Sequence, residues 1–353
     1  MRISEEQREL GAVVRAVLAG SGEDRAGAAR LLAEQVGAYG LTVPEQYGGA
    51  GFGLPEACVV LEELGRTLTP VAYLGTAVLA PAALLAAGDQ EAAARLLPGL
   101  AEGTRTAALG WAERGSWEAG AMSTAAERGT AGRAGWRLSG VKEHVLDGAE
   151  ADLLLVLART PRGLSLFESA PTAPGVAVEP LTAVDPSRPQ ARLRLDRAEA
   201  ALIGAEGAGE EVLARLRDTA CAALAAEQVG GAAYCLEATV EYALTRVQFG
   251  RAIGSFQAVK HRLADLFVQV EAARSAAMGA AREPARLGAV ARSVCSEAFT
   301  AAAGEMIQLH GGIGITWEHP AHRYFKRAYG SAELFGAPAL HRTRLARELI
   351  DAQ

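Results

Sequence analysis

Apolar positions in the first hundred residues recur at helical steps. Examples are Val59, Val60, Leu64 and Leu68. Steps of three and four residues place such side chains on one face of a helix, and the abundant Ala, Leu, Glu and Arg of this region favour helix. Pro and Gly concentrate in 44–51 and predict a loop there. We therefore expect residues 1–105 to form a helical domain.

The apolar runs between residues 106 and 205 are shorter, with Pro, Gly and Asp between them. They comprise 135–140, 152–159, 164–167, 176–178 and 192–195. Short strands at this spacing are typical of a small β-barrel or sandwich. We expect 106–205 to form a β domain.

Helical spacing returns in 206–353. Its clearest stripe consists of Phe256, Val259, Leu263, Phe267 and Val270. The stripe predicts one buried face on a long helix. The order is therefore helical, then β, then helical. The length of 353 residues agrees, because it corresponds to two or three domains of about 150 residues.

Composition limits the kinds of partner. Half of the residues are hydrophobic and 22% are charged, so the chain can bury a large core. The net charge of -6 provides no basic surface for nucleic acid. The acidic pairs at 62–63 and 210–211 are expected on solvated helix faces. Small molecules and other protein chains are the expected partners.

Several features favour a cytoplasmic protein. The four cysteines contain no C-x-x-C pair, which favours reduced thiols in the core. The first ten residues are polar and charged, unlike a secretory signal. The most apolar run, 77–87, contains Pro81 and is shorter than the about 20 residues of a membrane span. We expect no membrane segment.

Two segments of the last third carry candidate binding residues. Segment 242–250 contains Arg246, Phe249 and a glycine, which could together hold a phosphate and a flat ring. A helix ending at a glycine cap is the alternative. Segment 308–314 has consecutive glycines, whose backbone amides can approach a ligand closely. A helix-breaking loop is the alternative there.

Three histidines near the second segment suggest a metal site at first sight. They are His310, His319 and His322. No carboxylate or thiolate completes a ligand set at suitable spacing, and Pro320 disturbs the helix that would align them. We expect no metal.

Taken together, these segments resemble the signatures of the acyl-CoA dehydrogenase family. Residues 242–265 match Tyr-Ala-x-x-Arg-x-Gln-Phe-Gly-x-x-Ile-x-x-Phe-Gln-x-x-x-His-x-x-Ala-Asp, and Gln308 begins a Gln-x-x-Gly-Gly-x-Gly match. Further similarity lies at 41–51, 62–65, Pro320, Arg323 and 326–328. The resemblance covers nearly the whole chain. It implies a helical N-terminal domain, a small β-barrel or sandwich and a C-terminal four-helix bundle.

The resemblance also implies a reaction, α,β-dehydrogenation of an acyl-CoA thioester. In the family a carboxylate base removes the α-proton, the β-hydrogen leaves as hydride to FAD, and electrons pass to an electron-transferring flavoprotein. Certain family positions reach across a subunit interface to the pyrophosphate and adenosine end of a neighbour's FAD. Carried over to this chain, they are Arg246, Phe249, Gln308, Gly311 and Gly312.

Both family positions for the base lack a carboxylate here. Alignment without gaps places the usual Glu position on Phe335 and the alternative position on Ala220, with Cys221 where an Arg is common. Glu227 or Asp218 could serve as a displaced base. A carboxylate on the helix surface is the alternative interpretation of Glu227.

The family's contacts to the flavin ring are altered as well. Residues 112–116 read Ala-Glu-Arg-Gly-Ser where the family has Thr-Glu-Pro and a following Gly-Ser-Asp. Residues 144–146 read His-Val-Leu where it has Trp-x-Thr or Trp-x-Ser. Losing that hydroxyl removes a hydrogen bond of about 1 kcal/mol.

Three hypotheses fit this pattern. In the first, the chain is the non-catalytic half of an α2β2 heteromer and completes the FAD site of a paralogous subunit, as the resemblance to actinobacterial steroid side-chain dehydrogenases implies. In the second, it is a self-sufficient homo-oligomer with a displaced base. In the third, it is a structural or acyl-binding protein without redox activity. We favour the first, because the base and the flavin contacts are missing together while the cross-subunit contacts persist.

Overall fold

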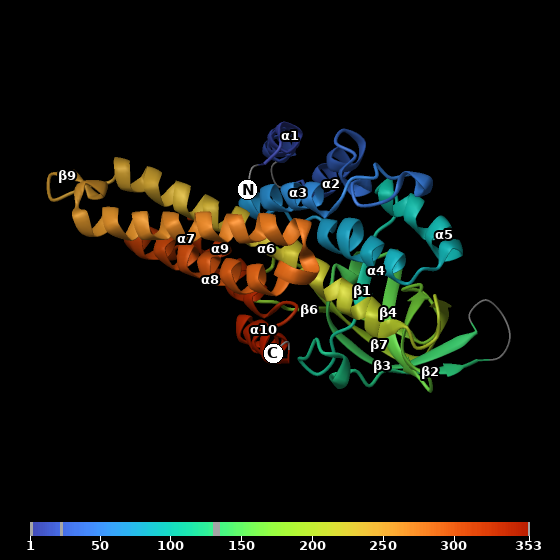
Figure 1. The fold of residues 1–353 in the computed structure, drawn as a ribbon. Coiled ribbons are helices and arrows are strands. Elements are labelled where there is room, and N and C mark those ends of the chain that lie inside the picture. The colour runs from blue at the N-terminus through green and yellow to red at the C-terminus, as the bar shows by residue number, and fades with distance from the viewer. Residues whose placement is uncertain (1–2, 22–23, 130–134, 352–353) are drawn as a thin grey trace. The chain divides into compact units, whose positions relative to one another are not determined.

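The structure is a computed structural model that describes residues 3–21, 24–129 and 135–351 (Figure 1). Two compact units follow from the contacts within it. Unit 1 contains Met1–Leu18, Cys58–Thr69 and Cys221–Gln353, and unit 2 contains Ala19–Ala57 and Pro70–Ala220. The proposed division of the sequence at residues 105 and 205 stays a prediction.

Helices form both ends of the chain. The N-terminal helices are α1 (Glu5–Ser21), α2 (Arg25–Glu34), α3 (Leu54–Thr67), α4 (Ala80–Ala86) and α5 (Gln90–Ala101), with short helices η1 (Ala38–Gly40), η2 (Glu45–Tyr47) and η3 (Leu74–Leu79). The C-terminal helices are α6 (Gly209–Thr245), α7 (Gln257–Arg282), α8 (Pro284–His310), α9 (Ala321–Glu333) and α10 (Pro338–Asp351), with η6 (Ile253–Ser255) and η7 (Gly311–Ile315). None of the helices in the described part combines the length and apolarity needed to cross a membrane.

A closed sheet forms the core of unit 2. Its strands are β1 (Ala107–Gly110), β2 (Ala125–Arg128), β3 (Trp136–Leu146), β4 (Leu153–Thr160), β5 (Gly163–Ser169), β6 (Val176–Leu181) and β7 (Gln190–Ile203), with η4 (Ala119–Ala121) and η5 (Gly148–Glu150) between strands. The sheet closes because β5 pairs with both β4 and β7, while β2 pairs with β3 and β4. Leu138, Val156 and Phe167 are fully buried inside. The predicted small barrel is confirmed.

The core of unit 1 is a bundle of long helices. Helices α7 and α8 are joined by the single residue Glu283, so they run back along one another, as Figure 1 shows. Phe299 and Met306 of α8 are buried against Leu266 and Val270 of α7 and against α6. The predicted helical C-terminal region is confirmed.

The predicted apolar stripe on α7 is partly wrong. The buried positions include Leu266, Val270, Ala273 and Ala277, whereas Phe267 is 56% exposed. The helical period of 3.6 residues puts 266, 270, 273 and 277 on one face and turns Phe267 about 100° away from Leu266. Phe267 therefore lies on the outer face of the bundle.

Two adjacent glycines of α6, Gly230 and Gly231, allow α3 and α8 to pack closely against this helix. A Cβ on Gly230 would lie well under 3.0 Å from the backbone oxygen of Glu62 in α3, and one on Gly65 of α3 would meet the oxygen of Glu227 just as closely. On the other side, a Cβ on Gly231 would overlap the ring of Phe299. Helix α6 is thus contacted on two faces by groups that leave no room for a methyl.

The sequence predicted a solvated helix face for the acidic pair at 62–63, and this prediction is wrong. Glu63 is 5% exposed and accepts hydrogen bonds from Arg15 Nε (2.8 Å) and Nη2 (2.7 Å). Glu62 pairs with Arg274 of α7. The contact of α3 with α6 places these carboxylates among arginines of the bundle.

Replacing Gly230 by Ala should therefore destabilise the protein by about 1–3 kcal/mol or more, because the two backbones must separate. The matched control is Gly304→Ala in α8, where an added Cβ meets nothing within 4 Å. That change should stabilise the helix by about 0.5–1 kcal/mol. Urea unfolding of both variants measures the difference. Equal effects would contradict a close contact between α3 and α6.

Candidate functional site

The two signature segments meet at one end of the bundle. The ring of Tyr242, near the end of α6, stacks on His310 at the end of α8 with a centroid distance of 4.3 Å. The Tyr242 hydroxyl donates to the backbone oxygen of His310 (3.4 Å). Because Arg246 lies one turn after Tyr242 and Gly311 directly follows His310, this stack brings both segments together.

A short hairpin presents the first segment. Strands β8 (Val247–Gln248) and β9 (Arg251–Ala252) are joined by Phe249 and Gly250, both with positive φ (53° and 77°). Figure 1 shows this hairpin extending beyond the helix ends. A left-handed Phe is unfavourable, and the ring it turns outward is 92% exposed. Arg246 is exposed too, with no side-chain partner in the described residues.

The glycines of the second segment leave space open. A Cβ on Gly311 or Gly312 would meet nothing within 4 Å, whereas one on Gly314 would lie 2.8 Å from the oxygen of Ile307. Gly314 is thus needed for packing, and Gly312 is not. Gln308 is also exposed. Both backbone and side chains remain accessible to a ligand here.

Apolar side chains surround these residues in unusual number. We call the exposed part of this bundle end the contact surface: Arg246, Gln308, Gly311 and Gly312 with the exposed apolar residues Leu244, Val247, Phe249, Ile313, Ile315 and Trp317. Single exposed apolar residues are ordinary, but a cluster marks a binding surface. The contact surface therefore fits a ligand, another chain, or both.

Trp317 and the histidines extend this arrangement. Lys326 Nζ lies 4.2 Å from the centroid of the Trp317 ring, and the His310 and His319 rings are 4.4 Å apart. His319 Nδ1 accepts the backbone N–H of Ala321 at the start of α9 (3.2 Å). Within the described part of the chain, no three His, Cys, Asp or Glu side chains are placed to hold a metal ion. The histidines serve packing and helix capping.

Phe335, the residue predicted from the sequence to stand at the family's usual base position, is buried and tightly held. Phe335 is 3% exposed and has a positive φ of 61°. The fully buried Arg292 places Nη2 between 2.7 and 3.1 Å from four backbone oxygens around it, those of Ser331, Ala332, Leu334 and Gly336. His341 Nε2 donates to the oxygen of Phe335 (3.1 Å). These hydrogen bonds hold in place a buried benzyl group, which cannot accept a proton.

The other candidate positions differ in their side chains and burial. Ala220 is fully buried. Cys221 Sγ lies 3.9 Å from both ring nitrogens of His341, whose pKa burial lowers to about 4. Asp218 is half-buried.

Glu227 lies inside the bundle rather than on the helix surface. It is 6% exposed, and its Oε1 accepts a hydrogen bond from Arg327 Nη1 (2.8 Å), itself almost inaccessible. Breaking such a buried pair leaves an uncompensated charge. The geometry favours a structural role for Glu227.

The segments 112–116 and 144–146, which the resemblance places at the flavin ring, lie in unit 2. Glu113 Oε1 pairs with the fully buried Lys142 (2.5 Å) and its carboxylate also accepts from the amides of Ser123 and Thr124. Burial raises the pKa of Glu113, but Lys142 and the hydrogen bonds outweigh it and lower the pKa to about 2. Burial lowers the pKa of Lys142 to about 8 against the attraction of Glu113. Glu113 is thus a structural anchor.

The sequence did not reveal that Tyr242 stacks on His310 or that Arg292 holds the backbone around Phe335. Tyr242 and His310 were inside the quoted motifs, so their positions at two helix ends were the available signal. Nothing in the sequence marks Arg292 apart from its occurrence in an apolar stretch of α8, where an unpaired charge is costly.

Comparison with known proteins identifies the fold and its family. The profile of the acyl-CoA dehydrogenase N-terminal domain matches residues 4–104, and that of the C-terminal domain matches residues 207–350. A helical bundle and a small barrel with these motifs define a dehydrogenase of the flavoprotein type. The chain belongs to the acyl-CoA dehydrogenase family.

Individual relatives narrow the position within the family. Acyl-CoA dehydrogenase IpdE2 of Mycobacterium tuberculosis is 42% identical over 92% of this chain and 86% of the relative. The ChsE4-ChsE5 complex from Mycobacterium tuberculosis contains a chain with a TM-score of 0.87 and 30% identity, covering 99% of this chain and 98% of that one. A chain of the Tcur3481-Tcur3483 steroid ACAD G363A variant superposes with a TM-score of 0.86 and 32% sequence identity. The match covers 99% of this chain and 98% of that one.

The neighbouring histidines His310 and His319 make the stability of the folded protein depend on pH. Burial lowers the pKa of His310 and His319, and the nearby histidines lower that of His319 further. The unfolded chain therefore binds more protons, so stability is complete above the ordinary pKa of about 6.5 and falls as the solution is acidified through it. His310→Phe keeps a ring against Tyr242, and should reduce the fall between about pH 7.5 and pH 5. Urea unfolding at both values measures it; an unchanged difference would exclude His310 as a contributor.

Proposed function

We propose that this chain is the non-catalytic subunit of a heteromeric, FAD-dependent acyl-CoA dehydrogenase and completes the cofactor site of a paralogous subunit. One observation carries the proposal. The contact surface is open and keeps every family residue for a neighbour's cofactor, while both positions for the base hold side chains, Phe335 and Ala220, that cannot take a proton.

The residues of the contact surface fit the dinucleotide end of FAD. Arg246, which has no side-chain partner among the described residues, offers its guanidinium to the pyrophosphate. Gly311 and Gly312 leave the backbone accessible for close approach. Phe249 offers an exposed ring face. FAD bound in the complex would supply the hydride acceptor. The chain's own task is to hold and cover that end of the cofactor.

The partner would be a paralogue that carries the base and binds the acyl-CoA. An α2β2 complex would pass its electrons to an electron-transferring flavoprotein. Similarity to a steroid ACAD and to a two-component complex supports a steroid side-chain acyl-CoA as substrate. The buried Glu227–Arg327 pair argues against Glu227 as a base in a self-sufficient enzyme, since a base must reach the substrate.

Expressed alone, the chain should lack flavin absorbance near 450 nm and dehydrogenase activity. Co-expression with a paralogue that has Glu at the base position should give an α2β2 complex with FAD at half the content of a homotetramer. Absorbance spectra and mass measurement of the complex check both statements. Stoichiometric FAD and turnover from the single chain would refute the proposal and favour a displaced base such as Asp218.

Arg246→Ala should lower the FAD affinity of that complex about tenfold or more, because a charge-assisted contact to a phosphate is lost. The control is Arg286→Ala near the start of α8, at the end of this helix away from the contact surface. Arg286 is exposed and pairs with Glu283. Equilibrium dialysis of FAD with each complex compares them. If Arg246→Ala kept full affinity while the complex assembled normally, a structural subunit without a cofactor role would be the better description.

A further inference from the structure

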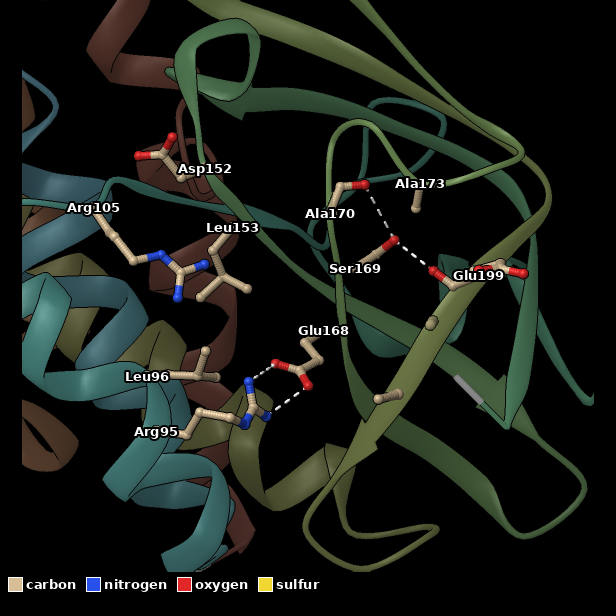
Figure 2. Close-up of a pocket in the computed structure, with 12 residues that line it drawn as sticks. Arg95, Leu96, Arg105, Asp152, Leu153, Glu168, Ser169, Ala170, Ala173 and Glu199 are labelled. Carbon is tan, nitrogen blue, oxygen red and sulfur yellow. Dashed lines mark hydrogen bonds and ion pairs between the residues drawn. The ribbon is translucent and has the colours of Figure 1, made fainter. Parts of the chain in front are cut away.

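A cavity of about 310 Å³ lies within unit 2, between α5 and the ends of β4, β5 and β7 (Figure 2). Leu96, Leu153, Ala200 and Ala201 give it apolar walls. Its size is at the lower end of the range for small-molecule sites. None of its lining residues belongs to the contact surface or to the positions of the base, so the inference below stands apart from the proposed function.

The carboxylates of the cavity already have partners. Glu168 accepts two hydrogen bonds from Arg95 (2.6 and 2.9 Å). Glu199 accepts one from Arg137 (2.8 Å). Asp152 accepts from the backbone N–H (2.9 Å) and the hydroxyl (3.0 Å) of Thr106. These acids are engaged without help from a ligand.

Arg105 differs from these carboxylates because its charged group has no partner among the described residues. Its guanidinium has no hydrogen bond or ion pair to any described residue, and Figure 2 shows it directed into the cavity. Its backbone N–H donates to the oxygen of Gly99 in α5 (3.0 Å). Its stem lies on Gly99, where a Cβ would come within 3.1 Å of Arg105 Cδ. The glycine thus seats the arginine so that the charged end reaches the cavity.

We propose that this cavity binds a small amphipathic monocarboxylate. The Arg105 guanidinium forms two parallel N–H···O bonds with the carboxylate, the geometry that its planar fork favours. Leu96 and Leu153 cover the hydrocarbon part. A phosphate dianion fits less well, because Asp152 and Glu168 share the lining and repel the second charge. An ammonium is repelled by Arg105 itself.

Three probes of matched size or charge test this assignment on the full-length chain. Hexanoate should bind saturably in isothermal titration calorimetry, and more tightly than hexylammonium or inorganic phosphate. Arg105→Ala should weaken hexanoate binding about tenfold or more, since the charge-assisted pair is lost. Arg162→Ala removes the same charge from a side chain that is 76% exposed elsewhere in unit 2 and should change nothing.

A second variant keeps the test decisive if Arg105→Ala fails to fold. Ala173→Met should narrow the cavity without changing its charge and should weaken hexanoate binding too. The assignment is overturned if hexanoate does not bind saturably, or if phosphate or hexylammonium binds as tightly. It is also overturned if neither variant weakens hexanoate binding. Hexanoate binding is measured without reference to FAD content. The result therefore tests the cavity independently of the proposed heteromer.

Discussion

The close contact of α3 and α6 at Gly65 and Gly230 is the constraint on which unit 1 depends. Backbone atoms meet there with no room for a methyl, and Gly231 admits the Phe299 ring from the other side. Near this contact the carboxylates of Glu63 and Glu227 are buried and that of Glu62 is half-buried. Each is paired with an arginine, since an unpaired buried charge is costly. The partners are Arg274 for Glu62, Arg15 for Glu63 and Arg327 for Glu227.

Buried charge in this protein holds backbone in place rather than performing chemistry. Arg292 collects four carbonyl oxygens and keeps Phe335 in a left-handed conformation that L-residues avoid. The Glu113–Lys142 pair similarly holds the backbone at Ser123 and Thr124, whose amides donate to Glu113. The loop around Phe335 and the segment around Glu113 are thus both held by buried charged groups.

The candidate site was predictable in part, for a definable reason. Arg246, Phe249, Gln308, Gly311 and Gly312 were found because they follow one another at fixed spacing in two short segments. Their proximity was not predictable, since it rests on the Tyr242–His310 stack between residues 68 positions apart. Glu227 looked like a surface carboxylate because a helical period reports only which positions share a face. What covers that face depends on Arg327, a hundred positions later.

By itself the sequence determined the order of helical and β regions and the family motifs, because periodicity, local turn chemistry and residue identity are written along the chain. It also determined most strands of the barrel, whose short apolar runs are bounded by Pro and Gly. Only the tertiary structure decided which charges are buried, which side of α7 faces α8, and that Arg105 lines a cavity. These are properties of contacts between distant segments, and pairing energies depend on distance and burial rather than on order along the chain.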